Sequence, residues 1–370
     1  MQQNLESYVS LLPHKSSWAQ PNTLIKGIST MSVSIVIGGE SVPATHSPEG
    51  ITLNPQGCLS LVEIESFPSN VTLIQGSLNI HDSPIRELPS PLTVNGDLLL
   101  ESCPNIQLPD NLVVTGDLIL SNSEMESTLL PRGLIVSGAL HISDCNIREL
   151  PNDIKVGRSI VMNGSKVKSL PDEIILPGSL DIGNTAISKL PRTLKLGSAF
   201  VATNCPIDSL PEIFEVSESI DISGTGIKTL PDNLTLYGDL FVNDSKIESL
   251  PENLSVYNLQ ISSTNIPEIP ESIKVNGFLY ANYTKIRKIP ASISSLEGTL
   301  SLVGSDIEYL PENISITGDL FLADSAIKHL PEGVQVQGTI YLGGTILSKD
   351  STQKEKASKR SAAINYDWRP

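Results

Sequence analysis

The stretch LPENLSVYNLQISSTNIPE, residues 250–268, contains the pattern on which the fold of the chain depends. Leu259 and Ile261 are separated by a polar residue, which is the alternation of a half-buried strand. Pro251 fixes its own φ and has no N–H to donate, so the residues after it turn or extend instead of forming a helix. The stretch therefore predicts a short strand between two turns. Its regularly spaced apolar residues are Val256, Leu259, Ile261 and Ile266.

Close copies of this unit fill most of the chain. Leu-Pro or a near variant opens fourteen segments at a nearly constant spacing. Each copy is too short to bury its own apolar face, so the copies must stack on one another. Stacking predicts a parallel sheet with about 4.8 Å between neighbouring strands. The openings are at Phe67, Leu88, Leu108, Leu130, Leu150, Leu170, Leu190, Leu210, Leu230, Leu250, Ile269, Ile289, Leu310 and Leu330.

The copy at 250–268 is one residue shorter than most and matches the leucine-rich pattern LxxLxLxxNxL, with Thr264 at the Asn position. Over residues 47–345 the chain resembles the Leu-Pro-type leucine-rich repeats of bacterial effector proteins that are injected into host cells, the EspR-like group above all. Similar repeats occur in phage proteins. The resemblance implies a β-rich solenoid, a curved leucine-rich-repeat array. A parallel β-sheet is expected on its concave face and extended or turn structure on its convex face.

The organisation along the chain follows from the repeats. Residues 1–30 are polar and lack arginine, which favours a flexible segment and a candidate type III secretion signal. Residues 31–66 are expected to form an N-terminal cap and a degenerate repeat, because the open end of a solenoid needs covering. Residues 67–345 form about 14 repeats. Residues 346–370 are charged and predict a flexible tail, in which Trp368 either docks on the last repeat or stays in solvent.

A column of small hydroxyl or thiol side chains occupies the Asn position of the pattern. Short hydroxyls bond local backbone groups as asparagine does, so we assign the column a structural role. Cys145 and Cys205 are three copies apart, about 14 Å along the stack, which is too far for a disulfide. We expect Cys58 to pack within the degenerate repeat. The named members of the column are Cys103, Cys145, Cys205 and Thr264.

Some effectors with such repeats carry a ubiquitin-ligase domain, whose nucleophilic cysteine precedes an aspartate by two residues. No cysteine of this chain has aspartate at that spacing. Few residues follow the last repeat, so the resemblance does not extend to a ligase activity.

Composition excludes several other classes of function. The formal net charge of -16 argues against nucleic acid and anionic membranes as partners. No apolar run is long enough to span a membrane, and no Sec-type signal peptide opens the chain. The five histidines show no metal-ligand spacing, and no cofactor motif is present. We therefore expect no enzyme activity, no metal and no cofactor.

One pair of carboxylates is a candidate for catalysis. Asp181 and Asp221 occupy the same mid-strand position two copies apart, hence about 9.6 Å from each other. That separation suits an inverting glycosidase and would require a carbohydrate-active β-helix. A solvated acidic face accounts for the same residues without any chemistry.

Aromatic residues gather on the exposed side of the later strands. Exposed rings on a rigid surface are favoured as anchors of protein interfaces, although bulky residues also suit exposed strand positions. We expect neighbouring aspartates to add negative charge. The predicted partner-binding residues are Phe241, Phe278, Tyr280, Phe321, Tyr341, Asp239 and Asp319.

These features predict a monomeric, non-catalytic scaffold for protein interaction. The resemblance implies a type III secreted effector that leaves the bacterium without a Sec signal and binds a host protein in the host cytoplasm. A second interpretation is a phage-derived or bacterial structural repeat protein that stays in the bacterial cytoplasm. The carbohydrate-active enzyme is the third.

Overall fold

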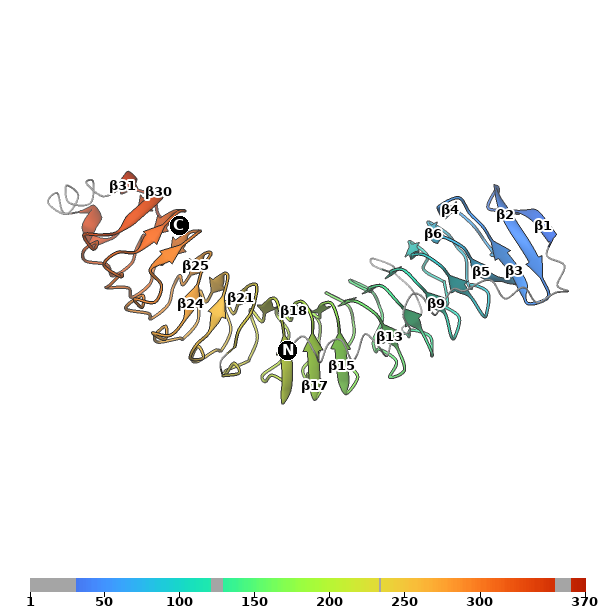
Figure 1. Cartoon of the computed structure of the whole chain (residues 1–370), viewed down its shortest axis with the longest axis horizontal. Coiled ribbons are helices and arrows are strands. Elements are labelled where there is room, and N and C mark those ends of the chain that lie inside the picture. Colours follow the sequence, from blue (N-terminus) through green and yellow to red (C-terminus); the bar gives the residue numbers. More distant parts are fainter. Residues whose placement is uncertain (1–30, 121–128, 233, 350–360) are drawn as a thin grey trace. The chain divides into compact units, whose positions relative to one another are not determined.

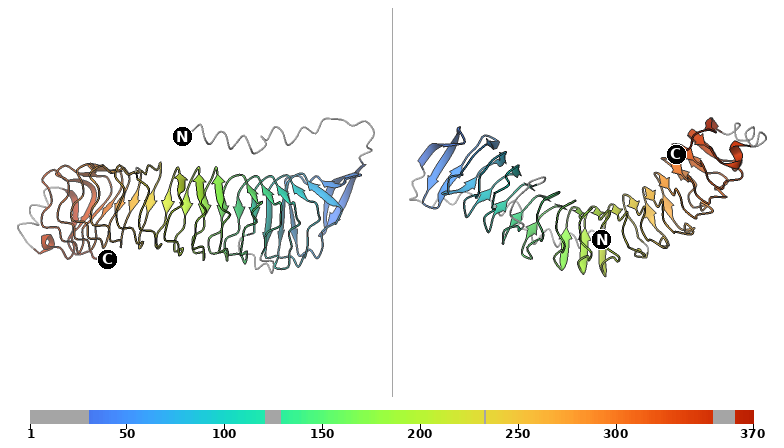
Figure 2. Two further views of the ribbon diagram at one scale, coloured as in Figure 1. Left: turned by 90° about the horizontal axis from the view of Figure 1, so that it is seen from below. Right: turned by 180° about the vertical axis from the view of Figure 1, so that it is seen from behind.

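The computed structural model describes residues 31–120, 129–232, 234–349 and 361–370. The candidate secretion segment 1–30 lies outside these residues. The chain divides into unit 1, Met1–Ile187 with Pro191–Gly197, and unit 2, Ser188–Leu190 with Ser198–Pro370. Each unit is a stack of short parallel strands that run across its length (Figures 1 and 2).

The main sheet of unit 1 joins the equivalent strand of successive copies in parallel. Leu98 pairs with Leu118, and Leu118 with Leu140, so equivalent residues stand side by side. The strands are β4 (Cys58–Val62), β6 (Ser77–His81), β8 (Leu98–Glu101), β10 (Leu118–Ile119), β12 (Leu140–His141), β14 (Ile160–Val161) and β16 (Leu180–Asp181).

The opposite side of unit 1 is extended backbone, as predicted, and it forms parallel ladders of its own. Helix is absent from the described part of this unit, because the prolines and turns of every copy interrupt it. The ladder strands are β3 (Gly50–Leu53), β5 (Val71–Ile74), β7 (Thr93–Val94), β9 (Val113–Val114), β11 (Ile135–Val136) and β13 (Lys155–Val156), followed by the pair β15 (Glu173–Leu176) and β17 (Thr193–Leu196).

An antiparallel hairpin precedes the first repeat. β1 (Met31–Ile37) pairs with β2 (Glu40–Ser47), which pairs antiparallel with β3. Gly38 and Gly39 form the hairpin turn with φ of 55° and 85°, which glycine adopts without steric cost. Because β3 also pairs in parallel with β5, the hairpin continues the ladder and changes its direction at the N-terminal end.

Unit 2 repeats the two-sided arrangement. Its main sheet contains β18 (Phe200–Val201), β20 (Ile220–Asp221), β21 (Leu240–Phe241), β23 (Leu259–Gln260), β25 (Leu279–Tyr280), β27 (Leu300–Ser301), β29 (Leu320–Phe321) and β30 (Gln335–Tyr341). Its opposite side contains β19 (Ile213–Val216), the pair β22 (Ser255–Val256) and β24 (Lys274–Val275), and β26 (Ser295–Leu296) with β28 (Ser315–Ile316). β30 is long enough to pair with both β28 and β29. In Figure 1 each unit, taken by itself, bends with its main sheet on the inner side.

The core of each unit lies between these two sides. In the copy at 230–249, Leu236, Leu240, Val242 and Ile247 are buried, with exposed fractions of 4% or less. Leu240 in β21 and Val242, which follows the strand, point inward, while Phe241 between them points outward. Repeating this pattern produces one continuous apolar column, as expected for copies that cannot bury their own faces.

The short copy keeps its place in the main sheet. Leu240 of the preceding copy pairs with Leu259, and Leu259 pairs with Leu279 of the following copy. The shortening is absorbed in the turn before β23, where Tyr257 takes the place that glycine holds in neighbouring copies. Its N–H donates to the carbonyl of Gly238 and its carbonyl accepts from Gly277, both at 2.7 Å. The missing residue therefore leaves the register of the aromatic strands unchanged.

Every described turn after a main-sheet strand contains one residue in the left-handed region. Their φ values run from 48° to 76°, and the column is mostly Asp, Asn and Gly, which tolerate this conformation. From Asp82 onward, the residue one position later is the small hydroxyl or thiol of the predicted column, whereas Ile64 follows Glu63 in the degenerate repeat. The left-handed residues are Glu63, Asp82, Ser102, Asp144, Gly164, Asn184, Asn204, Gly224, Asp244, Ser263, Tyr283, Gly304, Asp324 and Gly344.

The segment after the last repeat differs from the expected flexible tail. Ile346–Ser348 forms a short 3-10 helix, η1, with Leu347 buried, and Ser361–Asn365 forms β31. Residues 350–360 lie outside the described part. β31 pairs in parallel with β30, Ile340 beside Ile364. The open edge of the last repeat offers unpaired backbone groups, and β31 satisfies them, which outweighs the polar composition of the segment.

The left-handed column predicts different effects on stability for two substitutions of one exposed residue. Ser263 has φ of 58° in the turn of the short copy. Ser263→Val should lower the free energy of unfolding by about 1–2 kcal/mol, because a branched side chain clashes in this conformation. Ser263→Gly should cause no loss. Urea titration followed by circular dichroism measures both. Equal effects of Val and Gly would contradict the assignment of strain to this position.

Candidate functional site

Three aromatic rings form a stack on the main sheet of unit 2, on the face of the sheet that points away from the core. Phe241 lies in β21 and Tyr280 in β25, and Phe278 comes two residues before Tyr280. The ring centroids of Phe241 and Phe278 are 6.1 Å apart with planes 17° from parallel, and those of Phe278 and Tyr280 are 4.5 Å apart at 28°. All three side chains are half-buried. The stack therefore presents apolar ring surface on a rigid sheet.

A second aromatic cluster lies at the end of the same sheet. Phe321 in β29 and Tyr341 in β30 stack with centroids 4.3 Å apart and planes 5° from parallel. Trp368 covers them at an angle, with its centroid 5.1 Å from Phe321 and 5.2 Å from Tyr341. Of the two outcomes expected for Trp368, the structure shows docking on the last repeat.

Ser301 in β27 separates the two clusters. It occupies the mid-strand position of its copy, but it is buried, with its Oγ donating to Asn282 Oδ1 at 2.7 Å. The row of predicted residues is thus divided into the stack of Phe241, Phe278 and Tyr280 and the cluster of Phe321, Tyr341 and Trp368. We call these two groups together the aromatic face.

Asp239 and Asp319 lie beside the rings, and each also holds the backbone of the next copy. Asp239 Oδ1 accepts from the N–H of Asn258 at 3.2 Å and from its side-chain amide at 2.8 Å. Asp319 Oδ1 accepts from the N–H of Thr339 at 2.7 Å. The repeated bond shows a second polar column, which the sequence interpretation missed. Residues that make the same bond in unit 1 are Ser77, Asp97, Asp117 and Ser159.

Phe278 occupies this second column, where the other copies of unit 2 have small or polar side chains. Its N–H donates to Asn258 Oδ1 at 2.8 Å, so the backbone is held in register. A phenyl ring offers no acceptor to the following copy, so the position forgoes a hydrogen bond that contributes about 0.5–1.5 kcal/mol. A residue that departs from the structural pattern at an exposed position is a candidate for a binding role.

The predicted hydroxyl column closes the turns after the strands. Thr264 is buried, and its Oγ1 donates to the carbonyl of Ile261 at 2.7 Å. This bond gives a carbonyl in the turn a side-chain donor within the same copy. The side chains that bond the carbonyl three residues back in the same way are Thr185, Thr225, Ser245, Thr284, Ser305, Ser325 and Thr345.

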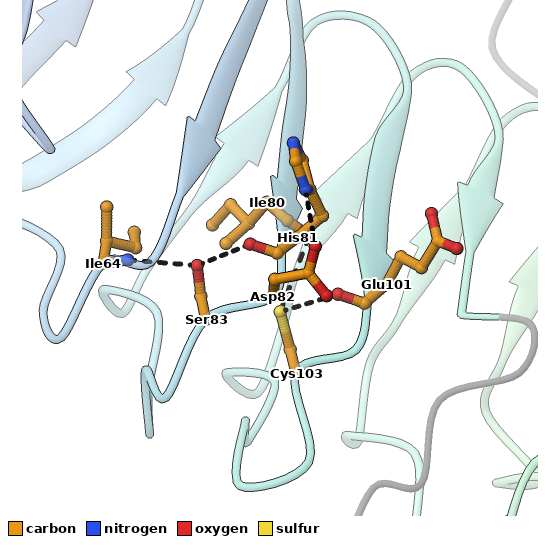
Figure 3. A network of polar contacts seen from close by, with 7 residues as sticks. All are labelled: Ile64, Ile80, His81, Asp82, Ser83, Glu101 and Cys103. Atoms are coloured by element: carbon orange, nitrogen blue, oxygen red, sulfur yellow. Dashed lines mark hydrogen bonds and ion pairs between the residues drawn. The ribbon is translucent and has the colours of Figure 1, made fainter.

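Cys103 shows how a thiol replaces the hydroxyl in unit 1 (Figure 3). Its Sγ donates to the carbonyl of Glu101 at 3.3 Å and to that of Ile80, in the preceding copy, at 3.5 Å. Ser83, the member of the column in that preceding copy, accepts from the N–H of Ile64 at 3.1 Å. The column therefore links neighbouring copies as well as closing turns.

The cysteines are all free thiols, but their environments differ. Cys103, Cys145 and Cys205 are buried, and the Cys145 Sγ donates to the carbonyl of Leu120 at 2.8 Å. Burial raises the pKa of the Cys103 thiol. Cys58 is exposed, contrary to the expectation that it packs in the degenerate repeat, because it faces outward in β4.

The carboxylates considered for catalysis have local roles. Asp181 Oδ1 accepts from the N–H of Gly183 at 2.9 Å, and Asp221 Oδ1 accepts from the N–H of Ser223 at 3.0 Å. Each bond is an Asx turn within its own copy, Asp181 in unit 1 and Asp221 in unit 2. Among the described residues, no group of three or more His, Cys, Asp or Glu side chains is placed to hold a metal ion. The same residues include no helix of the length and apolarity that crossing a bilayer requires.

The structure adds residues that the sequence interpretation did not place. Arg369 follows Trp368, and its Nε lies 3.5 Å from Asp324 Oδ1. Asn365 Oδ1 accepts from the N–H groups of Asp367 and Trp368 at 3.0 and 2.9 Å, which turns the chain within this segment. The Asn365 carbonyl accepts from the N–H of Leu342 at 2.8 Å, which holds the segment against the last repeat. No spacing or motif in the sequence indicated these contacts, because the segment lies outside the repeats.

No family model matches this chain, and no curated protein matches it. Two bacterial proteins are among those whose solved structures are similar to it. A leucine-rich-repeat protein of Leptospira interrogans has 13% identity and a TM-score of 0.38, with 74% of this chain and 91% of that chain covered. YopM from Yersinia enterocolitica has 16% identity and a TM-score of 0.36, with 76% and 85% covered.

The thiol environments predict selective labelling. The thiolate is the reactive form, so a buried thiol with a raised pKa reacts slowly. In native protein at pH 8, Ellman's reagent should modify Cys58 alone, and in urea it should modify all four cysteines. The Cys58→Ser variant, with no fast-reacting thiol in the native state, is the control. Rapid modification of Cys103 in native protein would show that its column is open to solvent.

Proposed function

We propose that the protein is a non-catalytic scaffold that binds another protein through its aromatic face. The observation that carries this proposal is the stack of Phe241, Phe278 and Tyr280 on an exposed, rigid sheet. The chain has only 4% aromatic residues, so such a concentration on one face is not a consequence of composition. Aromatic side chains are enriched at the centres of protein interfaces because they bury a large area for few rotatable bonds.

The setting that we propose is that of a type III secreted effector acting in the host cytoplasm, with a host protein as partner. The resemblance of the repeats to those of injected bacterial effectors and the polar, arginine-free segment 1–30 support it. The alternative is a phage-derived or bacterial structural repeat protein without a host target. The aromatic face favours a binding role in either setting, since a purely structural repeat array has no use for exposed rings.

The binding role predicts that removing rings removes partners. The Phe241→Ala, Tyr280→Ala, Phe321→Ala triple variant should retain less than about a tenth of each protein that the wild type captures from host cytosol, because truncated anchors at an interface centre cost about 2 kcal/mol or more each. Quantitative mass spectrometry of the captured proteins measures the change.

A matched triple variant of unit 2 separates this effect from a general loss of surface aromatics. Tyr237, Tyr283 and Tyr309 are 88%, 58% and 56% exposed and lie outside the aromatic face. Their replacement by alanine should leave capture unchanged. If both triple variants capture the same proteins as the wild type, binding through the aromatic face is wrong.

The proposed route of export has its own test. Residues 1–30 fused to a reporter enzyme should appear in the medium of bacteria with a functional type III apparatus and not in the medium of an isogenic apparatus mutant. A fusion of residues 31–60 serves as the control for leakage. Retention of the first fusion in both strains would favour the alternative of a protein that stays in the bacterium.

A further inference from the structure

Unit 2 contains the same constellation of side chains twice. GDLFVNDS at 238–245 and GDLFLADS at 318–325 differ at two positions, and each places its phenylalanine outward in the main sheet. In each, an aspartate lies two residues before the phenylalanine and another lies three residues after it. The second aspartate occupies the left-handed turn position, with φ of 53° at Asp244 and 54° at Asp324.

The later copy is occupied by a segment of the chain itself. Trp368 lies against Phe321 and Tyr341, and the guanidinium of Arg369 lies 3.5 Å from the Asp324 carboxylate. In this segment an aromatic residue is followed by a basic residue. The aromatic ring packs on Phe321 and Tyr341, and the basic group lies beside the carboxylate in the turn after the strand. The later copy therefore accepts an aromatic residue followed by a basic residue.

The earlier copy presents the same groups to solvent. Asp244 is exposed, and within the described residues it forms no ion pair. Phe278 stacks beside Phe241, as Tyr341 stacks beside Phe321 in the later copy. The copy therefore has both the aromatic surface and the carboxylate of the occupied one.

The charge around the earlier copy selects for a basic ligand. Asp221 is the register partner of Phe241 on β20, about 4.8 Å away along the sheet, and Asp239 precedes Phe241 on its own strand. No Lys or Arg stands at the positions equivalent to 239, 241 and 243 in any copy from Ala199 to Gly343. A cation placed over the ring would face carboxylates on both sides and no Lys or Arg in these three columns; Lys246, two residues after Asp244, is the nearest basic residue along the chain.

We infer that the copy at 238–245 is the docking site for an extended polypeptide segment of a partner, in which an aromatic residue is followed by arginine or lysine. The aromatic side chain packs on Phe241 and Phe278, and the basic group pairs with Asp244, as Trp368 and Arg369 do at the later copy. This inference deepens the proposed protein-binding function and rests on it.

A peptide supplied in trans tests the site. The probe is a fluorescein-labelled, amidated peptide with the sequence INYDWRP of residues 364–370. The later copy already holds this sequence within the chain, where the effective concentration is far higher, so the added peptide reports the earlier copy. Fluorescence anisotropy should show saturable binding to the full chain. Replacing Trp by Ala or Arg by Glu in the peptide should weaken it by about tenfold.

Variants of the protein locate the bound peptide. Phe241→Ala should weaken binding by about tenfold, and Asp244→Asn by about three- to fivefold, since an exposed ion pair contributes less. Asp244→Asn is chosen because asparagine also tolerates the left-handed turn, so folding is preserved. Tyr309→Ala, which removes a ring outside the aromatic face, should have no effect.

Three results would overturn the inference. They are the absence of saturable binding, binding that Phe241→Ala and Asp244→Asn leave unchanged, and binding that only Phe321→Ala abolishes. The proposed function has a separate test, because it is wrong only if the Phe241→Ala, Tyr280→Ala, Phe321→Ala variant still captures host proteins. If that variant loses its captured proteins and any of the three peptide results is found, the protein-binding function is supported and the aromatic-basic ligand is rejected.

Discussion

Backbone hydrogen bonds between equivalent strands of successive copies are the constraint on which the rest of the structure depends. Each main-sheet strand donates to the strand of the next copy: Leu240 N–H to the Asn258 carbonyl at 3.0 Å, and Ile261 N–H to the Tyr280 carbonyl at 2.8 Å. A parallel ladder of this kind holds the repeat length nearly constant, since any shift in register would turn core residues outward. The short copy shows the strength of the constraint, because it loses its residue in a turn and keeps its strand register.

The same ladder places equivalent side chains of successive copies in columns, and each column has a different structural role. Inward positions supply the apolar core, the hydroxyl column closes turns, and the second polar column, to which Asp239 and Asp319 belong, ties each copy to the next. The outer mid-strand column makes no hydrogen bond that recurs in every copy, so its residues vary from copy to copy. Aromatic side chains accumulate in this column at Phe241, Tyr280, Phe321 and Tyr341, and Phe278 joins them at the expense of a hydrogen bond in the second polar column.

Much of this arrangement was predictable from the sequence, and the failures have physical reasons. Thr264 and the cysteines Cys103, Cys145 and Cys205 fall in one column because a strict period carries every residue to a known face. Cys58 was misplaced because the degenerate repeat breaks the pattern that would have shown it facing outward in β4. The double role of Asp239 was missed because a side chain that bonds the neighbouring copy leaves no local mark in the sequence.

The sequence by itself determined the period, the solenoid, the apolar core and the side of the sheet on which the aromatic residues lie, because all of these follow from spacing and polarity. Only the tertiary structure decided which rings touch and what covers them. The contact of Phe241 with Phe278 joins residues two copies apart, and that of Trp368 with Phe321 brings a segment beyond the repeats onto the sheet. Such contacts depend on side-chain directions and on the pairing of β31 with β30, which no local pattern specifies.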